Sequence, residues 1–188
     1  MMKKLIMMCA ILISVAGLAS AGPTYLITFN EFPLDTVISN QYAPLGVVFT
    51  AATYNLPVIS MNGAMPTPPI LRPDGGPGFF QGDFWIQFTT PAVAVSFDSG
   101  YWDAIGAGQI DVYDPYMNPI ANLSNTVIGV NVTNLTGKIG YIYFNSVADG
   151  AGADLDNLKF TQIPAPGAIL LGGIGAGLVG WLRRRRTL

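Results

Sequence analysis

The stretch Lys138–Asn145 reads Lys-Ile-Gly-Tyr-Ile-Tyr-Phe-Asn, and its alternation decides the fold class. One face of the predicted strand carries Ile139, Tyr141 and Tyr143, and the other carries Ile142 and Phe144. Gln109–Tyr113 alternates in the same way, with its apolar side chains on a single face. A period of two residues is typical of β-strands, and strands that are half exposed indicate antiparallel sheets.

The remainder of the central region continues this pattern, with runs of Val, Ile, Thr, Phe and Tyr separated by turn residues. The further predicted strands are Tyr25–Phe29, Val47–Thr53, Phe84–Phe88, Ala94–Asp98, Thr126–Val132 and Asp156–Thr161. About eight short strands without a helical period predict an all-β fold, an antiparallel β-sandwich of the jelly-roll kind. Leu56–Gly82 is rich in Pro and Gly and is expected to be a long loop, either functional or a tolerated insertion.

The N-terminal segment, residues 1–21, has the pattern of a secretory signal peptide. Lys3 and Lys4 precede the apolar stretch Leu5–Leu18, and Ala19-Ser20-Ala21 supplies the small residues of a cleavage site. We expect the Sec translocon and signal peptidase as partners, with Ala19 and Ala21 at the cleavage site. An uncleaved membrane anchor is the alternative. The single cysteine, Cys9, lies in this segment, so cleavage leaves a chain without thiol chemistry.

The C-terminal segment, residues 164–188, begins with Pro164-Ala165-Pro166 and ends in four consecutive arginines. The 18 residues from Ala165 to Leu182 carry no charge. As a helix they would be about 27 Å long, close to the hydrocarbon thickness of a bilayer. They predict a C-terminal transmembrane helix, with Arg183, Arg184, Arg185 and Arg186 as a basic stop in the cytoplasm. The segment is either a permanent anchor or a signal that an enzyme recognises and cuts.

The order of Pro-Ala-Pro motif, apolar span and arginine cluster resembles the PEP-CTERM sorting tail of exported bacterial proteins. Ala165 occupies the position where that family usually has Glu. The resemblance implies processing by an exosortase, with Pro164, Ala165 and Pro166 as the sorting motif. It also implies anchoring in the inner membrane before processing. The destination would then be the surface or the extracellular, polysaccharide-containing matrix of a Gram-negative-type bacterium.

The body between these segments, residues 22–163, also resembles the jelly-roll domains of exported PEP-CTERM proteins, which are similar to carbohydrate-binding modules. The resemblance rests on three stretches, which are Ile27–Glu31 with Gly46–Phe49, Phe88–Phe97, and Asp154–Phe160. It implies the fold. The ligand is left open, and polysaccharide is the expected partner.

The charge of the body excludes one class of partner. It holds all eleven acidic residues of the chain and three of the nine basic ones, which leaves a net charge of −8. Nucleic-acid binding requires a basic surface and is not expected. The chain has no histidine, so a Ser-His-Asp triad is excluded. We expect no enzyme. A glycosidase-type carboxylate pair, Asp98 with Asp103 or Asp111 with Asp114, is the weaker alternative to ordinary turn residues.

Two candidate sites remain. A structural calcium ion would tie the first strand to the last in similar modules, and the positions that match are Glu31 (or its neighbour Asn30), Asp154 and Asp156. A cluster of aromatic residues near the long loop suggests a stacking platform for sugar rings; its members are Phe79, Phe80, Phe84, Trp85, Tyr101 and Trp102. We predict Tyr101 and Trp102 as ligand contacts, whereas Trp85 fits a core position better.

These features leave three functional hypotheses. The first is a non-enzymatic protein of the cell surface or extracellular matrix. The second is a carbohydrate-binding module, and the third is a carboxylate-based polysaccharide hydrolase.

Overall fold

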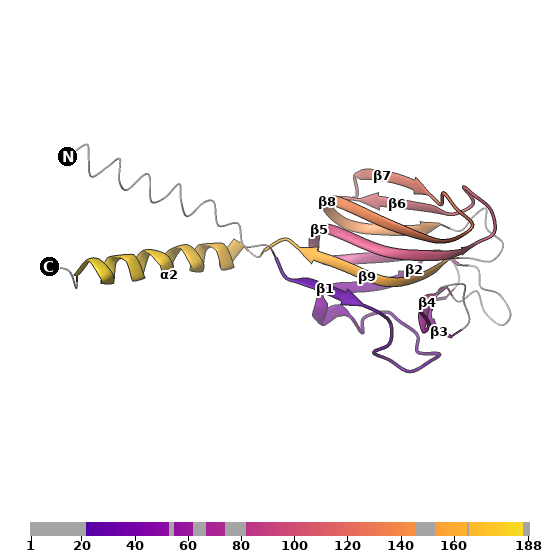
Figure 1. Ribbon diagram of the computed structural model, residues 1–188, viewed down its shortest axis with the longest axis horizontal. Coiled ribbons are helices and arrows are strands. Elements are labelled where there is room, and N and C mark those ends of the chain that lie inside the picture. The colour runs from indigo at the N-terminus through magenta and orange to yellow at the C-terminus, as the bar shows by residue number, and fades with distance from the viewer. Residues whose placement is uncertain are drawn as a thin grey trace. The chain divides into compact units, whose positions relative to one another are not determined.

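The computed structural model describes residues 22–52, 55–61, 67–73, 82–145, 153–164 and 166–185. The chain divides into two units. One is the β-rich body, Thr24–Gln162, and the other comprises Met1–Pro23 and Ile163–Leu188, whose described part contains helix α2, Pro166–Arg185 (Figure 1). The predicted signal peptide, residues 1–21, lies outside the described residues.

The described part of the body contains nine strands and one 3-10 turn, η1 (Ala43–Leu45). The strands are β1 (Thr24–Ile27), β2 (Val47–Ala51), β3 (Val58–Ser60), β4 (Ile70–Arg72), β5 (Phe84–Trp102), β6 (Gln109–Tyr113), β7 (Pro119–Ser124), β8 (Gly129–Asn145) and β9 (Asp154–Gln162). Every pairing between them is antiparallel. The predicted all-β, antiparallel class is therefore confirmed.

The long strands β5 and β8 each contribute to both layers of a sandwich (Figure 1). The first half of β5 and the second half of β8 join β2, β6 and β7, which gives the order β2-β5-β8-β6-β7. The second half of β5 and the first half of β8 join β9, whose outer edge pairs with β1 and β4. We call these the β6 sheet and the β9 sheet.

The corner where β5 passes from one sheet to the other lies between Gln87 and Ala92, where its register with β8 shifts. The chain there includes Pro91, which has no N–H to donate to a ladder. The matching corner of β8 contains Gly137 at φ 135°, a conformation that strongly favours glycine. Irregularities of this kind bend strands and let them change sheets.

The core lies between the inner faces of the two sheets. At its centre the Phe84 and Phe144 rings stack with centroids 4.8 Å apart, and Phe97 of the other sheet packs on Phe144 at 5.3 Å. Ile139 is fully buried in this core, whereas its predicted companions Tyr141 and Tyr143 lie on the outer face. The prediction of one face for all three was wrong because β8 turns its corner immediately before Tyr141.

Three further differences from the sequence prediction have local causes. The structure joins Phe84–Phe88 with Ala94–Asp98, and Thr126–Val132 with Lys138–Asn145, because the corners keep strand geometry. The predicted loop Leu56–Gly82 contains the short strands β3 and β4. Strand β4 pairs with the edge of β9, and β3 pairs with β4. Strand β7 begins at Pro119, which an edge strand tolerates because its N–H side faces solvent.

Gly108 lies directly against the buried indole of Trp102. A Cβ built at Gly108 would lie 2.1 Å from the ring of Trp102. We therefore expect Gly108→Ala to force the indole or the backbone to move, at a cost of about 1–3 kcal/mol in the free energy of unfolding. Chemical denaturation of the two chains measures this difference. Gly106→Ala meets no neighbouring atom but lies at φ 80°, so a loss there would report backbone strain and not packing; a Gly108→Ala chain as stable as the parent would contradict the packing argument.

The part of the chain that the structure describes includes no helix that is both long and apolar enough to cross a membrane. Helix α2 spans 20 residues and contains six glycines, each of which lowers its mean hydropathy relative to leucine or isoleucine. The predicted transmembrane helix is thus not supported.

Candidate functional site

The outer face of the β6 sheet gathers aromatic and polar side chains from three adjacent strands. Cross-strand pairing places Trp85 of β5 beside Tyr143 of β8, and Tyr143 beside Asp111 of β6. The next row brings Gln87, Tyr141 and Tyr113 together in the same order. We call these six residues, Trp85, Gln87, Asp111, Tyr113, Tyr141 and Tyr143, the aromatic face.

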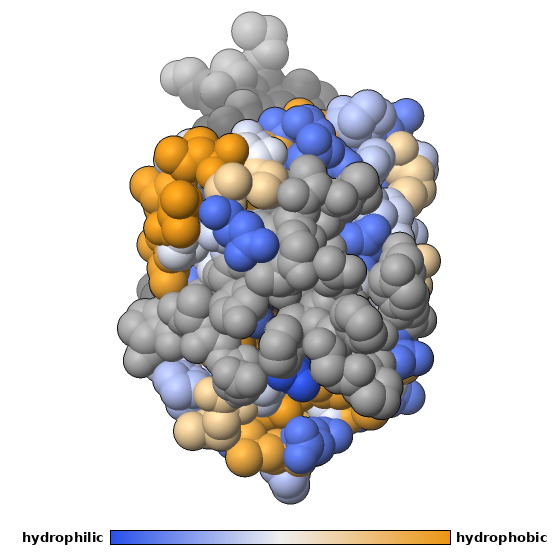
Figure 2. Space-filling model, turned by 90° about the vertical axis from the view of Figure 1, so that its right-hand side faces the viewer, coloured by the Kyte–Doolittle hydropathy of each residue, from blue (hydrophilic) through white to orange (hydrophobic). Residues whose placement is uncertain are grey.

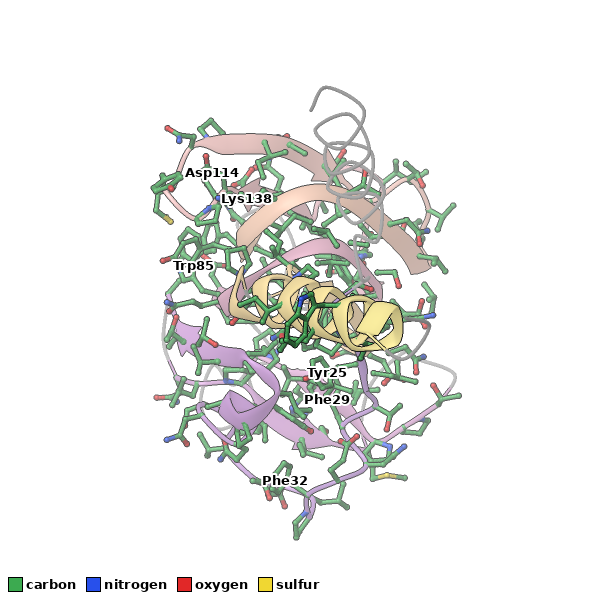
Figure 3. The ribbon with its side chains drawn as sticks, turned by 90° about the vertical axis from the view of Figure 1, so that its left-hand side faces the viewer. Tyr25, Phe29, Phe32, Trp85, Asp114 and Lys138 are labelled. Atoms are coloured by element: carbon green, nitrogen blue, oxygen red, sulfur yellow. The ribbon has the colours of Figure 1, made fainter. Side chains whose placement is uncertain are left out.

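The rings of this face contact one another. The indole of Trp85 stacks on Tyr143 with centroids 4.5 Å apart and planes at 19°, and it also meets Tyr113 at 5.6 Å. All three side chains are half-buried, so each keeps part of its ring surface open. Figure 3 shows Trp85 at the margin of the body, on the same side of the view as Asp114 and Lys138. Packing between the rings fixes them before any ligand arrives, which lowers the entropy that binding costs.

The hydroxyl of Tyr143 is held by a buried carboxylate. It donates a hydrogen bond of 2.9 Å to Oδ2 of Asp83, and Asp83 is 7% exposed. Burial, followed by this hydrogen bond and the nearby negative charge, raises the pKa of Tyr143 to about 12. Tyr143 therefore remains a neutral phenol at physiological pH. The hydrogen bond to Asp83, which precedes β5, fixes the orientation of its ring.

Polar groups surround the rings. Asp111 accepts a hydrogen bond from the amide of Asn122 on β7, which extends the polar rim to the edge of the sheet. Gln87 lies in the row between Val48 of β2 and Tyr141. Flat apolar rings rimmed by amide and carboxylate groups can stack on a ligand's C–H surface while they hydrogen-bond its hydroxyls.

The structure corrects the predicted ligand contact at Trp102. Its side chain is 2% exposed and belongs to the core, where Gly108 lies directly against the indole. Phe84 is also a core residue, whereas Trp85, which had been expected to fit the core better, lies on the aromatic face. The side chain of Tyr101 and the residues Phe79 and Phe80 lie outside the described part of the chain.

The predicted calcium ligands Glu31, Asp154 and Asp156 lie among the described residues of the body. The described residues contain no group of three or more acidic, His or Cys side chains that could hold a metal ion. Glu31 accepts hydrogen bonds from the hydroxyl of Tyr42 at 2.8 Å and from the backbone and hydroxyl of Thr28. Asp154 is buried at the start of β9, beside Asp156 in the sequence. Calcium binding by these residues stays a prediction.

Asp156 is a buried carboxylate that accepts hydrogen bonds from a hydroxyl and from a backbone N–H. Its Oδ2 accepts from the hydroxyl of Thr67 at 2.6 Å, and its Oδ1 accepts from the backbone N–H of Asn157 at 2.7 Å. Burial is the largest influence and raises its pKa, and the negative charges of Asp98 and Glu31 act in the same direction. Ionised Asp156 therefore costs stability in the folded chain.

We expect Asp156→Asn to stabilise the chain at neutral pH. Because the folded pKa of Asp156 is raised, the stability linked to its proton is fully present below the unfolded pKa and is lost as the pH rises through the folded pKa. The variant should therefore unfold at higher urea concentration than the parent at pH 7, and the difference should shrink as the pH falls towards 4. Measurement in EDTA excludes metal effects. A less stable variant at pH 7 would contradict this account, and added Ca²⁺ that stabilises the parent alone would support the calcium prediction.

The carboxylate pairs considered for hydrolysis are engaged in structural contacts. Asp98 accepts a hydrogen bond of 2.8 Å from the amide of Asn157. Asp114 caps the turn after β6 by accepting from the N–H groups of Tyr116 and Asn118 and from the Asn118 amide. The Asn118 amide is the largest influence lowering the pKa of Asp114, which is opposite to what a general acid needs.

The sorting residues lie in the second unit. Pro164 is described, Ala165 lies outside the described residues, and Pro166 begins helix α2. Pro at the first helical position is favourable because its missing N–H would have no partner there. Arg183, Arg184 and Arg185 form the last turn of α2, whereas Arg186 and the cleavage residues Ala19 and Ala21 lie outside the description.

Sequence reasoning missed the three tyrosines of the aromatic face, Tyr113, Tyr141 and Tyr143. Their positions opposite the buried residues of two predicted strands were the available signal. The sequence did not show that β8 lies between β5 and β6. This order depends on pairings between residues about 30 to 60 apart, which local sequence patterns do not encode.

No protein-family model matches the chain, and no curated protein sequence does. Among solved structures, the chain is similar to the K2 cleaved adhesin domain of Lys-gingipain, at 11% identity and a TM-score of 0.47 over 74% of this chain and 100% of that chain. A mutant family 29 carbohydrate-binding module gives 12% identity and a TM-score of 0.40 over 73% of this chain and 91% of the module. An arabinose-bound α-L-arabinofuranosidase gives 12% identity and a TM-score of 0.43, with 76% of this chain matching 27% of the enzyme. At these values the function has to be argued from the residues of this chain.

Proposed function

We propose that this chain is an exported carbohydrate-binding protein of the cell surface or extracellular matrix, which binds neutral polysaccharide through the aromatic face. The observation that carries the proposal is the contiguous contact of Trp85, Tyr143 and Tyr113 on the open side of a sheet. An unliganded monomer gains little from the exposed parts of three aromatic rings in one place, whereas a saccharide gains apolar surface for its C–H groups.

The charge of the face selects among polysaccharides. Asp111 and Asp83 lie within or beside the ring cluster, and the body carries a net charge of −8. A polymer rich in uronate or sulfate would be repelled, with a strength that depends on ionic strength. A neutral chain of hexose or pentose units suffers no such repulsion, so neutral polysaccharide is the proposed ligand class.

The proposal includes no catalytic step. The carboxylates that hydrolysis would need are committed to Asn157 and to the turn after β6. The chain also lacks histidine, the usual general base near neutral pH. Binding without turnover is therefore proposed, and release of reducing sugar from a bound polysaccharide would contradict it.

Affinity electrophoresis of the intact chain in gels that contain one polysaccharide each tests the ligand class. Neutral glucans, mannans and xylans form one set, and the anionic polymers alginate and polygalacturonate form the other. We expect at least one neutral polymer to retard the chain and both anionic polymers to leave it unretarded. Retardation by the anionic set alone would contradict the proposal.

Binding by the aromatic face is expected to vary little with pH between about 6 and 9, because the chain has no histidine and the pKa of Tyr143 is raised to about 12. Calorimetric titration of the retarding polysaccharide across this range measures the dependence. A tenfold change in affinity would show that a titrating group other than Tyr143 controls binding.

Export and sorting form the second part of the proposal. The predicted signal peptide and the order of Pro164-Ala165-Pro166, apolar segment and arginine cluster support handling by signal peptidase and then by an exosortase. The intact mass of the protein from native cells tests both cleavages at once. A mass that retains residues 1–21 and all four C-terminal arginines would contradict this part and leave the ligand-binding part untouched.

A further inference from the structure

A cleft of about 240 Å³ opens between the two sheets at the edge of the sandwich where β7 and β8 lie. On one side are Ile110 and Leu123, which pair across β6 and β7. On the other side are Ser99 and Thr133 of the β9 sheet. The cleft is distinct from the aromatic face, because Ile110 and Leu123 point inward from the sheet whose outer side carries that face.

The first half of β8 presents its polar side chains to this cleft. Asn131 and Thr133 share a face with their partners Ser99 and Phe97, which point inward, while Val132 between them is 69% exposed. A sandwich normally places apolar residues inward and polar residues outward. In this short segment of β8 the order is reversed, so burial of apolar surface does not explain which of its side chains point inward.

Side-chain hydrogen bonds of Asn131 hold this reversed register. Its Oδ1 accepts from the N–H groups of Thr126 and Val127 at 3.0 and 3.3 Å, and its Nδ2 donates to the carbonyls of Val127 and Gly129 at 3.1 and 3.2 Å. A slip of one residue would bury Val132 and break all four contacts. The register therefore leaves the polar side of the strand facing the cleft, with an exposed apolar edge beside it. In the view of Figure 2, hydrophobic residues gather at the upper left and near the lower end.

A second observation points to a ligand. Ser99 lines the cleft, is 0% exposed, and its Oγ has no hydrogen-bond partner. An unpartnered buried hydroxyl destabilises a folded chain, so native proteins seldom keep one without a water or ligand to complete it. This hydroxyl can both donate to and accept from a hydroxyl group of a ligand.

We propose that the cleft binds a single ring of a neutral sugar. No charged side chain lines it, which disfavours phosphate, uronate and amine groups. The aliphatic side chains of Ile110 and Leu123 suit the apolar face of a pyranose, and Ser99 and Thr133 offer hydroxyls opposite them. The volume lies just under the ~300–1,000 Å³ of pockets that hold drug-sized ligands, which suits one ring better than an oligosaccharide. This site does not depend on the aromatic face as a binding surface.

Titration of the intact chain with D-glucose, D-galactose and D-mannose, each followed by heteronuclear NMR, tests the site, with D-glucuronate as the anionic comparison. At least one neutral hexose should bind with a dissociation constant in the millimolar range and shift the amide signals of Ser99, Leu123 and Thr133. Glucuronate should shift none of them. No response to any neutral hexose would overturn the proposal and show that water alone completes Ser99.

Variants separate this site from the aromatic face and from loss of folding. Ser99→Ala should lower the hexose affinity about two- to tenfold, the loss expected for one neutral hydrogen bond, with an unchanged or higher melting temperature. Thr133→Leu should fill the cleft and abolish binding, whereas Thr136→Val, farther along the same strand and outside the cleft lining, should leave it unchanged. Trp85→Ala should also leave it unchanged. Loss of hexose binding in Trp85→Ala with retention in Thr133→Leu would place the sugar on the aromatic face and refute the cleft.

Discussion

Trp85→Ala is expected to weaken binding of the neutral polysaccharide by about thirtyfold. The indole contacts both Tyr143 and Tyr113, so its loss removes the central ring and the support of the other two. Truncation of an aromatic residue at the centre of a binding surface typically costs ~2 kcal/mol or more, and 1.4 kcal/mol corresponds to tenfold in affinity. Isothermal titration calorimetry with the polysaccharide that retards the parent chain measures the effect.

Two further variants test whether this loss is specific. Trp85→Tyr keeps an aromatic ring and should retain most of the affinity. Tyr116→Ala removes an aromatic side chain that is 75% exposed, but that lies in the turn between β6 and β7 outside the cross-strand rows of the face. It should bind as the parent does. Equal loss in Tyr116→Ala and Trp85→Ala would mean that the cross-strand cluster has no special role.

Phe144→Ala is expected to lower the free energy of unfolding by about 3–5 kcal/mol, which is a large share of the ~5–15 kcal/mol that stabilises a typical domain. Phe144 is 1% exposed and contacts Phe84 of its own sheet and Phe97 of the other, so its removal leaves a cavity between the layers. Equilibrium urea unfolding followed by far-ultraviolet circular dichroism measures the loss, and partial unfolding at room temperature is an acceptable form of the predicted result.

The matched control is Tyr143→Ala on the neighbouring position of β8. Tyr143 is half-buried on the outer face, so its loss should cost clearly less stability than the loss of Phe144. It should nevertheless weaken polysaccharide binding, which Phe144→Leu should not. A larger stability loss at Tyr143 than at Phe144 would contradict the assignment of inner and outer faces.

Alternation within single strands predicted the fold class correctly. The period of Gln109–Tyr113 matches strand β6 residue for residue, and Ile110 and Val112 are buried as expected. Alternation within one strand could not predict structural features that depend on the neighbouring strand. The inward position of Ile139 follows from the corner that β8 turns beside β5, and β4 exists as a strand because Leu71 pairs with Leu155.

The candidate site was predictable in its chemistry but not in its location. An exposed tryptophan near other aromatic residues was expected, and the sequence favoured Trp102 because it follows a glycine in a turn-like stretch. Strand β5 instead continues through Trp102, and Gly108 lies directly against the indole. Trp85 becomes the surface residue because its partners in the sheet are Thr50 and Tyr143, both on the outer side.

The most direct test of the proposed function is a titration of the intact chain with manno- and cello-oligosaccharides, observed at the indole N–H signals. Trp85 is half-buried on the aromatic face, and Trp102 is 2% exposed in the core and serves as the internal reference. We predict that a binding oligosaccharide shifts the Trp85 signal and leaves that of Trp102 in place. Binding that moves neither signal, or moves Trp102 alone, would contradict the assignment of the aromatic face as the carbohydrate site.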